Sequence, residues 1–143
     1  MTKREPRELL RIVLTVTDAF VALTAIGGGI ALAADLEGGR FSAAWLADTP
    51  FGSYLEPGLI LAVVVGGSAA AALVATLRSP VLGARLSVVA GLVLIGWILA
   101  EIAILTRDGE LVSGTEAVYL VLGLAMIGLG YRLGDRWPLV RAQ

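Results

Sequence analysis

The sequence has 143 residues, of which 57% are hydrophobic and 16% charged, and its formal net charge is −1. The mean hydropathy is +0.87. A soluble domain of this length could not bury that much apolar surface, which favours a protein that lies in a lipid bilayer. The absence of cysteine and histidine excludes disulfides, thiolate or imidazole metal sites, histidine-ligated haem and Ser-His or Cys-His nucleophiles. We therefore expect no enzyme activity, no cofactor and no metal site, and the charge balance gives no case for nucleic-acid binding.

The first predicted span, residues 12–34, is apolar apart from Asp18 and some threonines. A helix of that length crosses a hydrocarbon core of about 30 Å. Ala31-Leu32-Ala33 resembles a signal-peptide cleavage site, but the apolar stretch is longer than the hydrophobic region of a typical signal peptide. We therefore expect a transmembrane helix, in which Gly27-Gly28-Gly29 either bends the helix or lets a neighbour approach closely.

Residues 35–56 form an acidic loop whose aromatic residues are typical of a membrane interface: Phe41, Trp45, Phe51 and Tyr54. Within it, residues 42–46 are expected to form a short helix on the membrane surface. The second predicted span, residues 57–77, carries small residues at every fourth position, which favours close helix packing: Gly58, Ala62, Gly66 and Ala70.

The third predicted span covers residues 82–106, and Ser79 followed by Pro80 is a helix-start signal just before it. The short connection from the second span implies an antiparallel hairpin. The pattern Ser113-Gly114-Thr115-Glu116 fits a capping box and begins the fourth predicted span, residues 115–133.

The basic residues predict the orientation of the four spans. Nine of them fall on one side of the membrane if the spans alternate: Lys3, Arg4, Arg7, Arg11, Arg78, Arg85, Arg132, Arg136 and Arg141. Only Arg40 and Arg107 fall on the other side. Because basic loops stay in the cytoplasm, we expect an all-α membrane protein, an up-down-up-down bundle of four transmembrane helices, with both termini cytoplasmic. The expected location is a bacterial cell (inner) membrane.

Asp18 is the first of two acids in the predicted spans whose charge would be costly in contact with lipid. It lies about 10 Å along the helix from Arg11 and shares a face with Ala22, Ala25 and Gly29, which predicts that it points into the bundle. One interpretation is a proton-linked or cation-binding carboxylate. The other is a structural acid bonded to a nearby threonine, Thr15 or Thr17, or paired with an arginine at the inner rim.

Glu101 is the second such acid, near the end of the third span, where the helix dipole disfavours an anion. We expect an outward-facing pocket here for a cation, an amine or a lipid headgroup, with Trp97, Tyr119 and Glu56 as further candidate binding residues. Glu56 and Glu116 also have a structural explanation, since a carboxylate at a helix N-terminus meets the positive dipole end and can cap. A structural Glu101 would instead bond permanently to Tyr119, Arg107 or a nearby backbone group.

Several motifs between Phe51 and Gly130 resemble those of a group of small four-span bacterial membrane proteins of actinobacterial type, to which no activity is assigned. The motifs are Pro57-Gly58-Leu59-Ile60-Leu61, Val64-Val65-Gly66-Gly67, Gly91, Trp97-Ile98, Glu101, Tyr119 and Gly123. The resemblance implies the four-span topology and draws attention to Glu101. The residues around Asp18 do not match those of small multidrug transporters, and the chain lacks the cysteines of four-helix quinone-reducing proteins.

Two functions follow from these patterns. The first is a binding or accessory bundle that holds a lipid, a small ligand or a partner membrane subunit, as a single chain or a homo-oligomer. The second is a transporter that couples a small solute to protons or cations through Asp18 and Glu101. A membrane enzyme would have to work with carboxylates alone or with a carboxylate-bound metal.

Overall fold

The structure is a computed structural model, and it describes residues 5–36, 43–47, 49–104 and 112–135. Every described regular element is helical. In chain order they are α1 (Glu5–Ala33), the 3₁₀ turn η1 (Ala43–Leu46), α2 (Leu55–Ile60), the π-helical segment η2 (Leu61–Gly66), α3 (Gly67–Arg78), α4 (Pro80–Ile104) and α5 (Gly114–Asp135).

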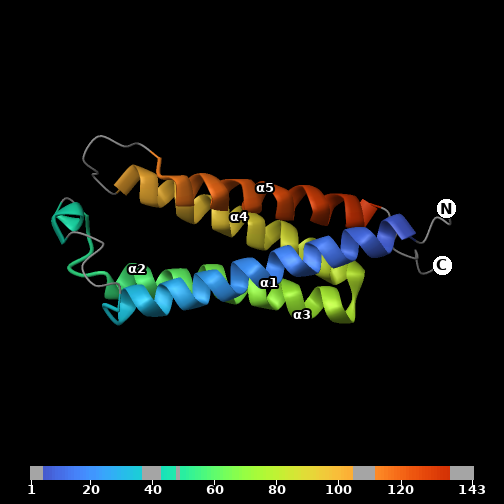
Figure 1. The fold of residues 1–143 in the computed structure, drawn as a ribbon, viewed down its shortest axis with the longest axis horizontal. Helices are drawn as coiled ribbons and strands as arrows, with labels where there is room; N and C mark the ends of the chain where they lie inside the picture. Colours follow the sequence, from blue (N-terminus) through green and yellow to red (C-terminus); the bar gives the residue numbers. More distant parts are fainter. Residues whose placement is uncertain (1–4, 37–42, 48, 105–111, 136–143) are drawn as a thin grey trace.

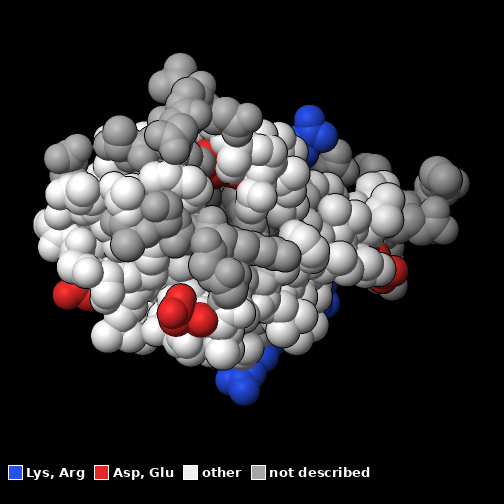
Figure 2. Space-filling view, turned by 60° about the vertical axis from the view of Figure 1, so that its left-hand side comes forward, with Lys and Arg blue, Asp and Glu red and all other residues white. Residues whose placement is uncertain are grey.

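Four helical stretches are long and apolar enough to cross a membrane, which confirms the expected all-α, four-span bundle. They cover Pro6–Ala33, Leu55–Arg78, Pro80–Ile104 and Gly114–Asp135. The second stretch joins α2, η2 and α3 into one continuous rod. On the face that Figure 2 shows, most of the described surface is uncharged, which suits contact with lipid.

The observed helices begin and end a few residues away from the predicted spans. α1 begins at Glu5 rather than residue 12, and α4 begins at Pro80 rather than residue 82. Hydropathy marks the part of a helix that lies in hydrocarbon, whereas the hydrogen-bonded helix continues into polar residues at the interface. The short helix expected at residues 42–46 is present as η1. Of the two alternatives for Gly27-Gly28-Gly29, close approach by a neighbour is present, because Gly29 packs against Gly58 of α2 within the unbroken helix α1.

The helices form two parts in Figure 1: α1 lies along the α2–η2–α3 rod, and α4 lies along α5. The first and last described helical residues, Glu5 and Asp135, lie at one end of the bundle, which we call the terminal end. The opposite end, which carries η1, is the loop end. At the loop end the two parts diverge, and α2 packs on α1 but on neither α4 nor α5 within the described residues.

Small residues let the helix backbones approach closely within each part. A Cβ atom added to Gly29 of α1 would lie 2.5 Å from the carbonyl oxygen of Gly58 in α2. A Cβ atom on Gly91 of α4 would lie 2.7 Å from the carbonyl oxygen of Gly123 in α5. The spacing of small residues in the second span therefore does mark a packed face.

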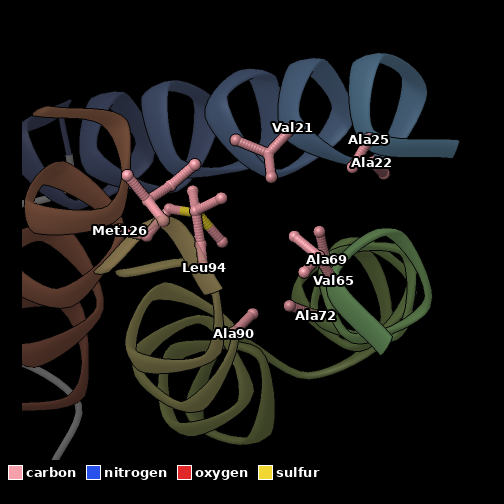
Figure 3. Packing of buried hydrophobic residues seen from close by; sticks show 10 residues of the cluster. Val21, Ala22, Ala25, Val65, Ala69, Ala72, Ala90, Leu94 and Met126 are labelled. Carbon is pink, nitrogen blue, oxygen red and sulfur yellow. The ribbon is translucent and has the colours of Figure 1, made fainter. Parts of the chain in front are cut away.

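The centre of the bundle is filled by side chains from all four spans. Figure 3 shows Val21 of α1, Leu94 of α4 and Met126 of α5 pointing toward one another, beside the smaller side chains of α1, α3 and α4. Near the terminal end, the Arg11 side chain donates to the carbonyl oxygens of Thr76 at 3.0 Å and Leu77 at 2.8 Å. These bonds satisfy carbonyls of the last turn of α3, so Arg11 fixes α1 to α3.

Candidate binding pocket at the loop end

The divergence of the two parts leaves a pocket of about 520 Å³ at the loop end. In Figure 2, which turns this end forward, a recess is visible with acidic side-chain atoms beside it. Its wall comes from every span and from the segment that contains η1: Thr24, Ala25, Gly28, Leu32, Trp45, Leu46, Phe51, Tyr54, Pro57, Leu61, Leu94, Trp97, Ile98, Ala100, Glu101, Ile104, Ser113, Thr115, Glu116 and Tyr119. We call this cavity the loop-end pocket.

The pocket runs along α4. Leu94 lies toward the middle of the bundle and Glu101 toward the loop end, and seven residues of helix separate them by about 10 Å. Leu94 and Ala25 are buried and also belong to the central core, so the pocket floor is apolar. Thr24 is the polar wall residue beside Ala25, and its hydroxyl donates to the Phe20 carbonyl oxygen within α1 at 2.7 Å. The acids and most of the aromatic side chains lie toward the other end, which gives the cavity a mostly apolar depth and a polar mouth.

Trp97 lies between these two regions, one helical turn from Glu101 toward the middle of the bundle. Its indole Nε1 is buried, and no acceptor among the described residues lies within hydrogen-bond distance. An indole N–H can only donate, and a buried donor without an acceptor costs free energy. Trp97 therefore contributes to the wall a ring whose buried N–H has no acceptor among the described residues.

Two acids line the wall, Glu101 and Glu116, and they belong to different helices. Glu101 is half-buried in the last turns of α4, and Glu116, in the first turn of α5, is only 4% exposed. Glu116 Oε2 accepts from the backbone N–H of Ser113 at 2.8 Å, and the Glu116 N–H points to Ser113 Oγ at 3.4 Å. The predicted capping box is thus present, and it places the Glu116 carboxylate at the pocket as well as capping α5.

The structure brings together three of the four predicted binding residues. Glu101, Trp97 and Tyr119 all line the loop-end pocket. Glu56 does not: it is exposed, while its neighbour Pro57 is buried and faces the cavity. The prediction for Glu56 relied on its level in the membrane alone, and that level does not determine which side of the helix a side chain occupies.

Glu116 also lines the wall, although it was not among the predicted binding residues. The sequence placed it at the same outer level as Glu101 and Glu56, but its capping role was the favoured explanation of the acid. The spacing of i to i+3 from Glu116 to Tyr119 could have supplied the signal, since it puts both side chains on one helix face. The contribution of Trp45 and Leu46 depends on how the long loop folds back, which helical periodicity does not describe.

Asp18 lies away from this pocket. Its side chain is 0% exposed, as predicted, and its Oδ2 accepts from the Ser87 hydroxyl of α4 at 2.7 Å. The expected threonine partners bond within α1 instead, Thr15 to the Arg11 carbonyl and Thr17 to the Val13 carbonyl. No described residue bonds Asp18 Oδ1. Asp18 therefore ties α1 to α4 through a partner that the sequence analysis did not name.

No group of three acidic side chains that could hold a metal ion occurs in the described part of the chain. No protein-family model, curated protein or solved structure matches the sequence. The resemblance to small bacterial membrane proteins therefore extends to the four-span architecture and identifies no family.

Proposed function

We propose that the protein is a membrane-embedded binding bundle that holds one small amphiphilic molecule in the loop-end pocket. The observation that carries the proposal is the form of that pocket: a volume of about 520 Å³ with a mostly apolar floor and a polar, aromatic mouth. Cavities of about 300–1,000 Å³ with mostly apolar walls and a few polar groups are typical of sites for single small ligands.

The charges of the bundle favour an outward-facing pocket in a bacterial cell (inner) membrane. All basic residues in the described part of the chain belong to the terminal end: Arg7, Arg11, Arg78, Arg85 and Arg132. Because basic segments remain in the cytoplasm, the terminal end is placed inside and the loop end outside. The ligand then enters from the outer leaflet or from the space outside the membrane.

The geometry gives less support to a transporter that uses Asp18 together with Glu101. Asp18 is not a wall residue, and Ala25, the nearest wall residue on its own face of α1, is seven residues or about 10 Å further along the helix. The two acids therefore do not share a cavity in this structure.

Apolar side chains on the outside of the bundle, such as Val63, leave room for lipid, a second copy of the chain or a partner subunit.

Two neighbouring glycines provide a matched test of the pocket. Gly27 and Gly28 both have open space where a Cβ would be, but only Gly28 lines the pocket. Gly28→Leu should fill the cavity, and Gly27→Leu should place the same side chain outside it.

The measurement is native mass spectrometry of protein extracted from membranes. We expect one retained small molecule per chain for the unsubstituted protein and for Gly27→Leu, and loss of that molecule for Gly28→Leu. A chain that carries no bound molecule, or one that both variants retain equally, would refute the proposed function.

A further inference from the structure

We infer that Asp18 binds a proton inside the bundle, and that this proton links α1 to α3 as well as to α4. The site lies outside the loop-end pocket, so the inference goes beyond the proposed function and does not depend on it. It is carried by the hydrogen bonds of three buried side chains, Asp18, Thr76 and Ser87.

The three side chains belong to three different helices, α1, α3 and α4, and each is 0% exposed. Ser87 Oγ donates to Asp18 Oδ2 at 2.7 Å, which uses the hydrogen of that hydroxyl. The Thr76 hydroxyl lies beside the carboxyl, but it donates to the Ala72 carbonyl oxygen, one turn earlier in α3, at 2.8 Å. A hydroxyl has one hydrogen, so toward Asp18 the Thr76 oxygen can only accept.

The second carboxyl oxygen, Asp18 Oδ1, indicates which form of the acid is present. It is buried, and no described group bonds it. An ionised carboxylate can only accept hydrogen bonds, so its Oδ1 would remain without a donor in the interior, which is costly. A protonated Oδ1 is itself a donor, and the Thr76 hydroxyl oxygen beside the carboxyl can accept its hydrogen. The neutral acid therefore completes a chain of donors from Ser87 through Asp18 to Thr76.

The basic side chains of the described helices around Asp18 are directed elsewhere. Arg11, two turns earlier on the same face of α1, donates to two carbonyl oxygens in the last turn of α3. The basic residues of α3, α4 and α5 are exposed: Arg78, Arg85 and Arg132. The acids of α4 and α5 line the loop-end pocket or are exposed: Glu101, Glu116 and Asp135. An anion at Asp18 would thus be buried without a counter-ion, which costs more than a neutral acid.

A proton also fits this site better than a metal ion does. A Cβ atom on Gly83 of α4 would overlap the Thr76 backbone and hydroxyl oxygen, so α3 and α4 are in direct contact beside the carboxyl. A calcium ion needs about six to eight oxygen ligands. The described side chains at this site supply the Asp18 carboxyl and two hydroxyls.

Binding of the proton makes the contact between these helices sensitive to pH. With the proton present, α1 is bonded to α4 through Ser87 and to α3 through Thr76. Its loss would leave a buried anion whose Oδ1 has no donor, so water would have to enter and α1 would have to move away from its neighbours. Alkaline conditions should therefore loosen the packing of α1 on α3 and α4.

Infrared difference spectroscopy of the protein in lipid vesicles measures the protonation state, because the C=O stretch of a neutral carboxyl is separate from the bands of a carboxylate. The spectrum of Asp18→Asn is subtracted from that of the unsubstituted protein at neutral pH. We expect a neutral-carboxyl band from Asp18, and we expect it to disappear only at alkaline pH. Asp135→Asn is the matched control: it removes an exposed aspartate, and the Asp18 band should remain.

Two further variants test the partners of the carboxyl. Ser87→Ala removes the donor to the carbonyl oxygen Oδ2, so the neutral-carboxyl band should move to higher frequency. Thr76→Val removes the acceptor of the proton, so the band should disappear at a lower pH. If the Thr76 hydroxyl instead donated to an ionised Asp18, the same change would raise that pH, which would contradict the inference.

Carboxylate bands from Asp18 at neutral pH would overturn the inference, and so would a neutral-carboxyl band that the addition of sodium or calcium ions abolishes. If Asp18→Asn does not fold, aspartate labelled with heavy carbon in the unsubstituted protein and in Asp135→Asn identifies the band instead. Failure of this inference leaves the proposed function standing, because the variants that test the loop-end pocket, Gly27→Leu and Gly28→Leu, do not involve Asp18.

Discussion

The three consecutive glycines of α1 occupy three different environments. A Cβ on Gly29 would overlap the carbonyl oxygen of Gly58, whereas Gly27 and Gly28 have open space, on the outside of the bundle and in the pocket respectively. The sequence alone predicted a special role for the triplet and did not assign it, because one run of glycines presents three different faces of a helix.

Gly29→Ala should therefore destabilise the bundle, by about 1–3 kcal/mol, because an extra carbon forces α1 away from α2. Gly27→Ala is the control: it should be neutral or stabilise the fold by up to about 1 kcal/mol, since alanine restricts the unfolded chain. Thermal unfolding in one detergent measures both. Equal stability of the two variants would show that α1 and α2 are not in contact at Gly29.

Asp18 and Ser87 form the polar link between α1 and α4. Ser87→Ala removes the hydroxyl that donates to Oδ2 of the buried Asp18 and should cost about 1–3 kcal/mol. Asp18→Asn keeps an acceptor oxygen and should retain the fold. A double-mutant cycle with Asp18→Leu and Ser87→Ala, read by unfolding, should give less than additive losses, because both changes remove one interaction. Additive losses would mean that the two side chains are not bonded in the membrane.

At the scale of the elements, the starts of α4 and α5 were predictable from local signals, whereas α1 begins at Glu5, well before its predicted span. Ser79 adopts an extended conformation and Pro80 opens α4, as the Ser-Pro signal indicated, and the capping box of Ser113 and Glu116 forms. Such signals are local, since each side chain bonds a backbone group within three residues. The π-helical segment η2 carried no signal of this kind. It ends at Gly66, which packs against Ile26 of α1, and the pattern of a single helix does not describe such a contact.

The capping box gives a prediction for α5. Ser113→Ala should lower stability by about 0.5–2 kcal/mol, because the first turn of the helix loses a side-chain acceptor. Thr115→Ala, at the exposed residue two positions later, is the matched control and should change stability little. Amide hydrogen exchange should be faster in the first turn of α5 for the Ser113 variant only. Unchanged exchange in that turn would contradict the cap.

For the whole molecule, hydropathy was enough to predict four spans, because lipid forces every span to be an apolar helix. The site was only partly predictable. Glu101 was identified because neither capping nor the helix dipole explains an acid at that position. A pocket beside Glu101 was expected, but its shape was not, since the shape arises from the divergence of α2 from α4 and from the return of Trp45 to the wall. Neither arrangement is encoded in the periodicity of one helix.

The orientation of the bundle is testable because the chain contains no cysteine. Single cysteines at Thr2, Ser79 and Gln143 should react with an impermeant maleimide only after the cells are opened. Cysteines at Gly39 and Gly109 should react in intact cells. The expectation follows from the excess of basic residues on one side. Labelling of Gly39 from the cytoplasm alone would reverse the orientation and place the pocket inside.

The most direct measurement of the central claim is the position of a bound bromine atom. Crystals grown with a brominated amphiphile, the 3,3-dimethylbutyl ester of 8-bromooctanoic acid, would be examined by anomalous diffraction. The account predicts a bromine peak inside the loop-end pocket, near Leu94, Ala25 and Leu61 on its floor. Bromine peaks found only on lipid-facing surfaces, such as that around Val63, which is 67% exposed, would contradict the claim that this bundle binds a ligand.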